Sequence, residues 1–137
     1  MEGSIVYIDR SDVREGKLPE VRKAIAALVE LVERREPQLL AYAFFLDDAD
    51  SRMSVLAVHP DAASMELHMD VGTPGFRRFE GLIDLRTIDV YGRPSDKVRE
   101  QLRQKAEMLG AAVRVTIHES ISGFTRPGLR TRPVGVD

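Results

Sequence analysis

The chain has 137 residues, of which 43% are apolar and 31% charged, so it can build a hydrophobic core and differs from a disordered segment. Its net charge of -2 offers no positive field for nucleic acid or anionic lipid, and the absence of cysteine excludes disulfides and thiolate chemistry. The longest apolar run, residues 39–46, is too short to cross a bilayer. We therefore expect a soluble, cytoplasmic protein without a nucleic-acid or membrane partner.

The first half of the chain alternates between strand and helix patterns. Residues 5–8 favour a strand, which we expect to end at the polar residues 9–12. Between Leu18 and Arg35, apolar residues recur at steps of three and four, which predicts a helix. Two further strands are predicted at residues 38–46 and 52–59, and the short polar segment between them predicts a hairpin.

The second half completes the pattern of a known arrangement. Asp61 is the expected N-cap of a helix that Gly72-Thr73-Pro74-Gly75 interrupts, and a second short helix is expected at residues 76–83. A strand at residues 85–91 follows. The order β-α-β-β-α-β predicts an α+β, ferredoxin-like fold, in which two helices cover one face of a four-stranded antiparallel sheet.

A C-terminal extension at residues 94–118 follows this core of residues 4–91. Its Pro94-Ser95-Asp96 segment opens a helix, Gly110 closes that helix as a C-terminal cap, and residues 113–117 predict a fifth strand. Residues 125–137 have hardly any periodicity, so we expect a flexible tail or an arm on a partner subunit. The predicted single domain is residues 1–124.

Both faces of the predicted sheet carry apolar side chains. In the strand at residues 52–59, Met53, Val55 and Ala57 alternate with Leu56 and Val58. Because neither face suits water, we expect two sheets to pack face to face in a homodimer. Such packing can leave a cavity between each sheet and its own helices.

Two histidines are the most informative candidates for chemistry. His59 ends a predicted strand, and His68 lies about two turns into the next helix, so both could reach the mouth of that cavity. A near-neutral imidazole could take a proton from a phenol or hydroquinone, whose anion could then pass electrons to O2 without a cofactor. In this hypothesis His68 is the catalytic base, and His59 or Tyr42 orients the substrate. The alternative is that both histidines are ordinary core residues.

The apolar members of the candidate site are aromatic residues and a methionine. We assign substrate binding to Tyr42, Phe44, Met65, Phe76 and Phe79, because ligand pockets are mostly apolar. At helical and strand spacing, the same residues also suit an ordinary core.

Metal binding is a weaker use of the polar residues. His59, His68 and Asp61 are adequate ligands, but they lack a recognised metal-binding spacing, so we assign no metal. Three aspartates in residues 47–50 imitate part of a calcium loop without its glycine and closing glutamate. We expect a solvated hairpin tip there.

Several segments together resemble a known family. They are the opening strand, Gly16-Lys17-Leu18, Glu36-Pro37-Gln38-Leu39-Leu40-Ala41-Tyr42, Ser64-Met65-Glu66-Leu67-His68-Met69 and Gly75-Phe76-Arg77-Arg78-Phe79. In order and spacing, residues 4–91 resemble the antibiotic biosynthesis monooxygenase-like family of dimeric α+β barrels, with His68 at that family's characteristic histidine. The resemblance implies the ferredoxin-like fold, a homodimer and oxygenation of an aromatic compound without a cofactor.

The chain departs from that family at one informative position. Members that oxidise aromatic polyketides or quinols commonly carry Glu-x-Trp at the end of the third strand, where this chain reads Ala57-Val58-His59, and the chain has no Trp. Haem-degrading relatives also rely on a Trp. Two hypotheses follow: a cofactor-independent monooxygenase acting on a small aromatic or quinol-like compound, or a non-catalytic dimeric barrel that binds a small apolar ligand.

Overall fold

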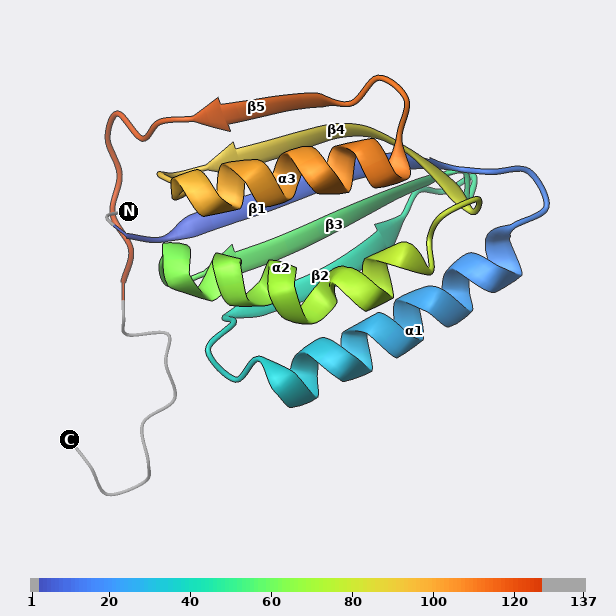
Figure 1. The fold of residues 1–137 in the computed structure, drawn as a ribbon, viewed down its shortest axis with the longest axis horizontal. Coiled ribbons are helices and arrows are strands. Elements are labelled where there is room, and N and C mark those ends of the chain that lie inside the picture. Colours follow the sequence, from blue (N-terminus) through green and yellow to red (C-terminus); the bar gives the residue numbers. More distant parts are fainter. Residues whose placement is uncertain (1–2, 127–137) are drawn as a thin grey trace.

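The computed structural model describes residues 3–126 as one five-stranded sheet with helices packed on it (Figure 1). In chain order the elements are β1 (Ile5–Val13), α1 (Leu18–Arg35), β2 (Ala41–Leu46), β3 (Arg52–His59), α2 (Ala62–Arg77), β4 (Ile83–Tyr91), α3 (Asp96–Leu109) and β5 (Arg114–His118). The predicted βαββαβ core with a C-terminal helix and strand is therefore confirmed.

The strands follow the order β2-β3-β1-β4-β5, with β1 at the centre. The first four strands pair antiparallel, and Ile5 of β1 lies opposite His59 of β3. In contrast, β5 pairs parallel with β4, because α3 carries the chain back between them in a β-α-β crossover. The extension thus turns an antiparallel core into a mixed sheet.

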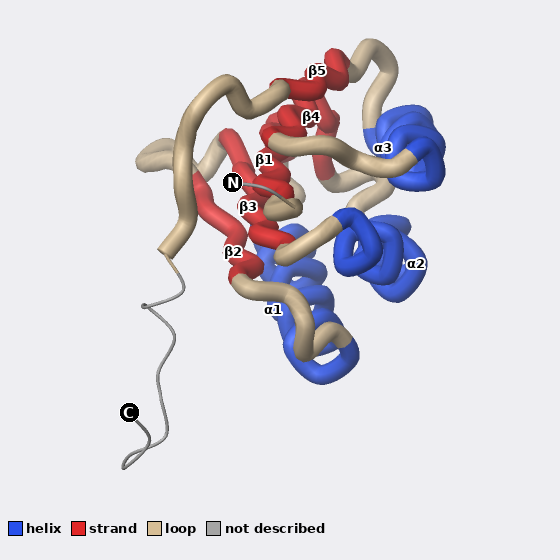
Figure 2. Tube along the Cα trace, turned by 90° about the vertical axis from the view of Figure 1, so that its left-hand side faces the viewer, coloured by secondary structure: helices blue, strands red, loops and turns tan. Residues whose placement is uncertain are grey.

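All three helices within residues 3–126 lie on one face of the sheet, and the other face is left without a covering layer (Figure 2). The helix-facing side chains of β1, β3 and β4 form the core with the inner faces of the helices. Examples are Ile5, Val55 and Val90 from the sheet and Leu28 and Leu102 from the helices, each at most 4% exposed. The candidate site predicted between the sheet and its own helices therefore belongs to this core layer.

The boundaries of β1 and β2 differ most from the sequence prediction, whereas those of β4 and β5 differ by only one or two residues. β1 continues through the polar residues to Val13, because its backbone pairs with both β3 and β4 and the alternation simply places Asp9 and Ser11 inward. β2 begins at Ala41 rather than residue 38, since residues 37–40 form the connection from α1. The helix at Leu18–Arg35 and the strand at Arg52–His59 are as predicted.

The predicted break in the second helix is wrong. α2 runs without interruption from Ala62 to Arg77, with Pro74 inside it, and the Thr73 hydroxyl donates to the Met69 carbonyl at 2.5 Å. Its two glycines are packing positions: a Cβ on Gly72 would lie 2.5 Å from the Phe76 ring, and one on Gly75 would lie 2.6 Å from Leu28 of α1. Glycine here permits close packing instead of ending the helix.

The separate helix predicted at residues 76–83 is also wrong. Phe76 belongs to the last turn of α2, a turn with a positive φ of 78° at Gly81 follows, and Ile83 already begins β4. Positive φ is a glycine conformation, so this residue ends the helical pattern.

Two predictions concern the outer parts of the chain. No helix within residues 3–126 is long and apolar enough to span a membrane. The predicted tail begins at residue 125, and all but its first two residues lie outside the described part of the chain. The proposed limits of the domain stay a prediction.

Candidate active site

The layer between sheet and helices contains polar side chains as well as apolar ones. Seven polar or charged residues are buried there: Asp9, Ser11, Glu36, His59, Ser64, His68 and Lys105. Burying such groups is unfavourable unless they find partners, so their contacts identify what the interior is built to hold. Six of them lie in two clusters, one around His68 and one around Lys105, and Ser11 lines a cavity with the second.

The first cluster joins His68 of α2 to Glu36, the residue that follows α1. The Nδ1 atom of His68 lies 2.9 Å and 3.0 Å from the two carboxylate oxygens of Glu36, and both side chains are at most 5% exposed. Packing of α1 against α2 brings these residues together across 32 positions in sequence. A carboxylate at Nδ1 favours a proton on that nitrogen, which leaves Nε2 as a proton acceptor.

Aromatic rings surround this imidazole. The ring centroids of Tyr42 on β2 and His68 are 5.0 Å apart, and those of Phe76 and His68 are 5.6 Å apart. Burial raises the pKa of Tyr42 well above its usual value, and the negative charges of Asp9 and Glu36 add to this effect. Tyr42 therefore stays protonated and can act as a hydrogen-bond donor.

His59 occupies the end of β3 beside His68, with 5.4 Å between the ring centroids. Its Nδ1 lies 2.8 Å from the Ser64 hydroxyl in the first turn of α2. Burial, followed by the nearby charge of His68, lowers the pKa of His59 to about 3. His59 is thus neutral at ordinary pH and suits an orienting role better than that of a base.

The second cluster joins Lys105 of α3 to two residues of β1. The Lys105 ammonium donates to the Tyr7 hydroxyl at 2.9 Å and to Asp9 Oδ2 at 3.2 Å, and Tyr7 donates to the same carboxylate oxygen at 2.5 Å. The ammonium also lies 4.1 Å from the centroid of the Phe76 ring, a cation–π arrangement. Burial raises the pKa of Tyr7 well above its usual value, with Asp9 adding to the shift.

A small cavity lies next to the second cluster, with Asp9 and Lys105 in its lining. Its walls are mostly apolar, and its polar lining comes from Asp9, Ser11, Tyr42 and Lys105. The cavity has a volume of about 20 Å³, which is enough for one water molecule. A larger guest needs side chains to move.

The structure brings together most of the residues predicted to bind substrate. Tyr42, Phe44, Phe76 and Phe79 all line the cavity, and the rings of Phe44 and Phe79 stack at 6.1 Å. Met65 lies in the core away from this lining, completely buried. The two predicted catalytic histidines lie behind Tyr42 and Phe76, outside the lining itself.

Sequence reasoning missed three charged members of the two clusters: Asp9, Glu36 and Lys105. A signal existed for Lys105, which falls on the apolar stripe of α3 with Val98, Leu102 and Leu109. Asp9 continues the inward alternation of Ile5 and Tyr7. Glu36 follows the helix and has no periodic neighbour, so only its packing reveals its role.

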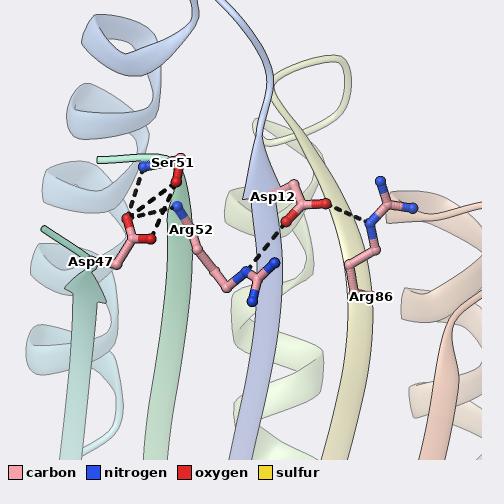
Figure 3. Close-up of polar contacts among 5 residues, drawn as sticks. All are labelled: Asp12, Asp47, Ser51, Arg52 and Arg86. Carbon is pink, nitrogen blue, oxygen red and sulfur yellow. Dashed lines mark hydrogen bonds and ion pairs between the residues drawn. The ribbon is translucent and has the colours of Figure 1, made fainter. Parts of the chain in front are cut away.

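Residues 3–126 contain no group of three His, Asp or Glu side chains arranged to hold a metal ion. His59 and His68 face different partners, and Asp61 caps α2 by accepting from the Ser64 backbone at 2.8 Å. In the hairpin, Asp47 accepts from the backbone N–H groups of Ser51 and Arg52 at 2.8 Å and 3.0 Å (Figure 3). Those bonds lower the pKa of Asp47 and shape a turn.

Solved structures with the same architecture include MupZ from Pseudomonas fluorescens, with a TM-score of 0.72 and 18% identity over 95% of this chain and 100% of MupZ. SnoaB from Streptomyces nogalater, described as a cofactor-independent oxygenase, has a TM-score of 0.56 and 16% identity over 68% of this chain and 95% of SnoaB. PA3566 from Pseudomonas aeruginosa has a TM-score of 0.57 and 21% identity over 69% of this chain and 98% of that protein.

This chain has the antibiotic biosynthesis monooxygenase fold. The resemblance expected from the sequence is confirmed for the fold. No protein-family model and no curated protein matches the sequence. The match to MupZ spans the fold together with the α3–β5 extension, whereas the match to SnoaB leaves about a third of this chain unmatched.

Proposed function

We propose that this protein is a cofactor-independent monooxygenase that acts on a small aromatic or quinol-like compound. The observation that carries the proposal is the buried Glu36–His68 pair beside Tyr42 and the aromatic cavity. A carboxylate that holds the imidazole through Nδ1 fixes its tautomer and stabilises the imidazolium that forms when Nε2 takes a proton. SnoaB supports the proposal, since an oxygenase of this type has the same fold.

In the proposed reaction, Nε2 of His68 takes the proton of a phenolic hydroxyl. The resulting electron-rich anion transfers an electron to O2, and the two radicals combine to form a carbon–oxygen bond. Cleavage of the O–O bond leaves one oxygen atom on the ring and releases the other as water, so a hydroquinone becomes a hydroxyquinone. All electrons that reduce O2 come from the substrate, and the proton held by His68 leaves with the water.

The surroundings of His68 favour this chemistry. The pair with Glu36 leaves Nε2 of His68 as a proton acceptor. The raised pKa of Tyr42 keeps its hydroxyl neutral, so it can donate a hydrogen bond to the developing anion. The walls of the neighbouring cavity, apart from Asp9, Ser11, Tyr42 and Lys105, are aromatic and aliphatic, and apolar walls strengthen both interactions.

Access to the cavity is proposed to run between α2 and α3. A surface groove of about 660 Å³ separates these helices, and its floor includes Phe76 and Lys105, which also line the inner cavity. Phe76 thus stands between the groove and the interior. Movement of this ring would join the two spaces and make room for an aromatic substrate.

The uncovered face of the sheet is the proposed dimer interface. One half of this face is apolar, with Phe45 on β2 53% exposed and Leu56 and Val58 on the adjacent β3. The other half carries charges that are already paired: Asp12 of β1 binds Arg52 at 3.4 Å and Arg86 at 2.7 Å (Figure 3). A second copy would cover the apolar half without leaving those charges unpartnered.

The test of the proposed chemistry is oxygen uptake with a panel of small hydroquinones. Replacing the base in His68→Gln is expected to lower kcat by about 100-fold or more, the usual range for loss of a general base. Glu36→Gln is expected to lower kcat as well, because the amide cannot stabilise the imidazolium. The matched control is His118→Gln, a histidine on β5 that pairs with Asp89 far from the cavity and should leave kcat unchanged.

Two results would contradict the proposal. One is turnover of an identified hydroquinone that is the same in His68→Gln and in the wild type. The other is no oxygen consumption by the wild type on any member of the panel together with saturable binding of those compounds, which would favour the non-catalytic barrel that binds a small apolar ligand.

A further inference from the structure

Two buried polar atoms in the cavity have no partner within residues 3–126. The Oδ2 atom of Asp9 accepts hydrogen bonds from Tyr7 and Lys105, but Oδ1 of the same carboxylate accepts none from these residues or any other in this range. The Ser11 hydroxyl likewise has no hydrogen-bond partner. Both residues are at most 2% exposed, and a buried polar atom without a partner is costly and uncommon.

These two atoms belong to one place in the fold. Asp9 and Ser11 are two residues apart on β1, so their side chains point to the same face of the sheet, and both line the cavity. β1 is the central strand, which fixes their backbone on both sides through β3 and β4. The unpartnered atoms are therefore presented to the cavity by a rigid support.

The chemistry of the pair specifies its guest. A carboxylate oxygen only accepts hydrogen bonds, whereas a serine hydroxyl both donates and accepts. A hydroxyl complements both, because it donates to Asp9 Oδ1 and accepts from the Ser11 hydroxyl. A carboxylate or phosphate guest would instead meet the negative charge of Asp9, whose balancing cation, Lys105, is already engaged.

We propose that Asp9 and Ser11 form a hydroxyl-binding site at the β1 end of the cavity, for a phenol-class ligand whose ring lies among Phe44, Phe76 and Phe79. Lys105 and Tyr7 hold the carboxylate in place through Oδ2 and leave Oδ1 for the ligand. This inference rests on the proposed function only for the aromatic character of the ligand. It adds a second point of polar recognition, distinct from His68, and so selects substrates with a hydroxyl that is not the reacting one.

A water molecule is the other source of a hydroxyl donor. The cavity of about 20 Å³ fits one water molecule but no aromatic ring. The phenolic hydroxyl would take the place of that water when Phe76 moves toward the groove between α2 and α3. The experiment must therefore separate a site that binds a phenol from a site that binds water alone.

The experiment measures binding, so it does not depend on turnover. The full chain is titrated with 4-ethylphenol and with 4-ethylanisole, its methyl ether, which has a similar body without the hydroxyl donor, and affinity is followed by calorimetry and by amide chemical shifts. The wild type is expected to bind 4-ethylphenol at least about tenfold more tightly than the ether. Ser11→Ala is expected to remove about tenfold of the affinity for the phenol and to leave that for the ether unchanged, because it deletes one hydrogen bond at a buried site.

Asp9→Asn tests the carboxylate, with thermal unfolding measured in parallel because the change also weakens the contact with Lys105. The matched controls are Ser54→Ala and Asp12→Asn, which lie on the uncovered face of the same sheet and should bind both probes as the wild type does. Equal affinity of the wild type for phenol and ether, unchanged phenol affinity in Ser11→Ala, or no binding of either probe would each overturn the inference and indicate a site for water alone. Selective phenol binding without oxygen uptake would support this site and contradict the oxygenase proposal.

Discussion

At the scale of single residues, burial decides what each histidine can do. His68 is held by a carboxylate, whereas His59 contacts a serine hydroxyl and lies beside a second imidazole. The same residue type at two adjacent positions thus obtains different chemistry from its surroundings. In the proposed reaction, this separation favours proton transfer by His68 and orientation by His59.

The lowered pKa of His59 predicts a pH dependence of stability. The unfolded chain takes up a proton at this residue below about pH 6.5, whereas the folded chain resists it down to a pKa of about 3. Stability is therefore lost as the pH falls through this window, with about 2 kcal/mol lost between about pH 7 and pH 5.

Urea unfolding at a series of pH values measures this loss as a change in the free energy of unfolding. His59→Gln should remove that part of the pH dependence, and His118→Gln, which changes a half-exposed histidine, should retain it. A wild-type protein whose stability has the same pH dependence as His59→Gln would show that His59 does not titrate in this way.

At the scale of elements, the α3–β5 extension is part of the site, not an addition at its edge. α3 supplies Lys105 to the interior, and β5 extends the sheet beside β4. Gly110 makes this attachment possible. It has an extended backbone, and a Cβ there would lie 2.5 Å from the carbonyl oxygen of Leu85. The glycine at the end of α3 is needed for close approach to β4 and does not adopt the left-handed conformation of a common C-terminal cap.

Gly110→Ala is accordingly expected to lower the free energy of unfolding by about 1–3 kcal/mol, because backbone cannot yield as a flexible side chain does. Chemical denaturation measures the change. Ala112→Ser, at an exposed position of the same loop, is the control and should stay within about 0.5 kcal/mol of the wild type. An alanine variant as stable as the wild type would mean that α3 and β4 can separate without cost.

At the scale of the whole molecule, helices cover one face of the sheet, and no helix of residues 3–126 covers the other (Figure 2). The uncovered face places Leu56 of β3 opposite Ile8 of β1 and Ala43 of β2, at the centre of its apolar half. Burying this half against a second copy would remove apolar surface from water, which is the main favourable term in such associations.

The proposed dimer predicts a mass change on substitution. Leu56→Lys is expected to convert the wild-type dimer into a folded monomer in light scattering at micromolar concentration, because it places a charge in the interface. Leu67→Lys is the matched control: Leu67 is 41% exposed on α2, on the helical side of the molecule, and its substitution should leave the dimer intact. A monomeric wild type would contradict the interface.

The fold could be predicted from the sequence because its information is local. Apolar residues recur at steps of three and four between Leu18 and Arg35 and alternate over Arg52–His59. Each pattern indicates which face of one element is buried. The pattern misled at Gly72 and Gly75, since glycine looks the same in sequence whether it ends a helix or lets another residue pack against it. Only the neighbouring side chains distinguish these two uses.

The sequence by itself determined the order of the elements, the inward position of His68 and the aromatic residues that meet at the cavity. The tertiary structure alone decided the pairing of His68 with Glu36 and of Lys105 with Asp9, which are 32 and 96 positions apart. The physical reason is that periodicity tells which face of an element is buried, whereas the partner of a buried charge depends on which elements pack together.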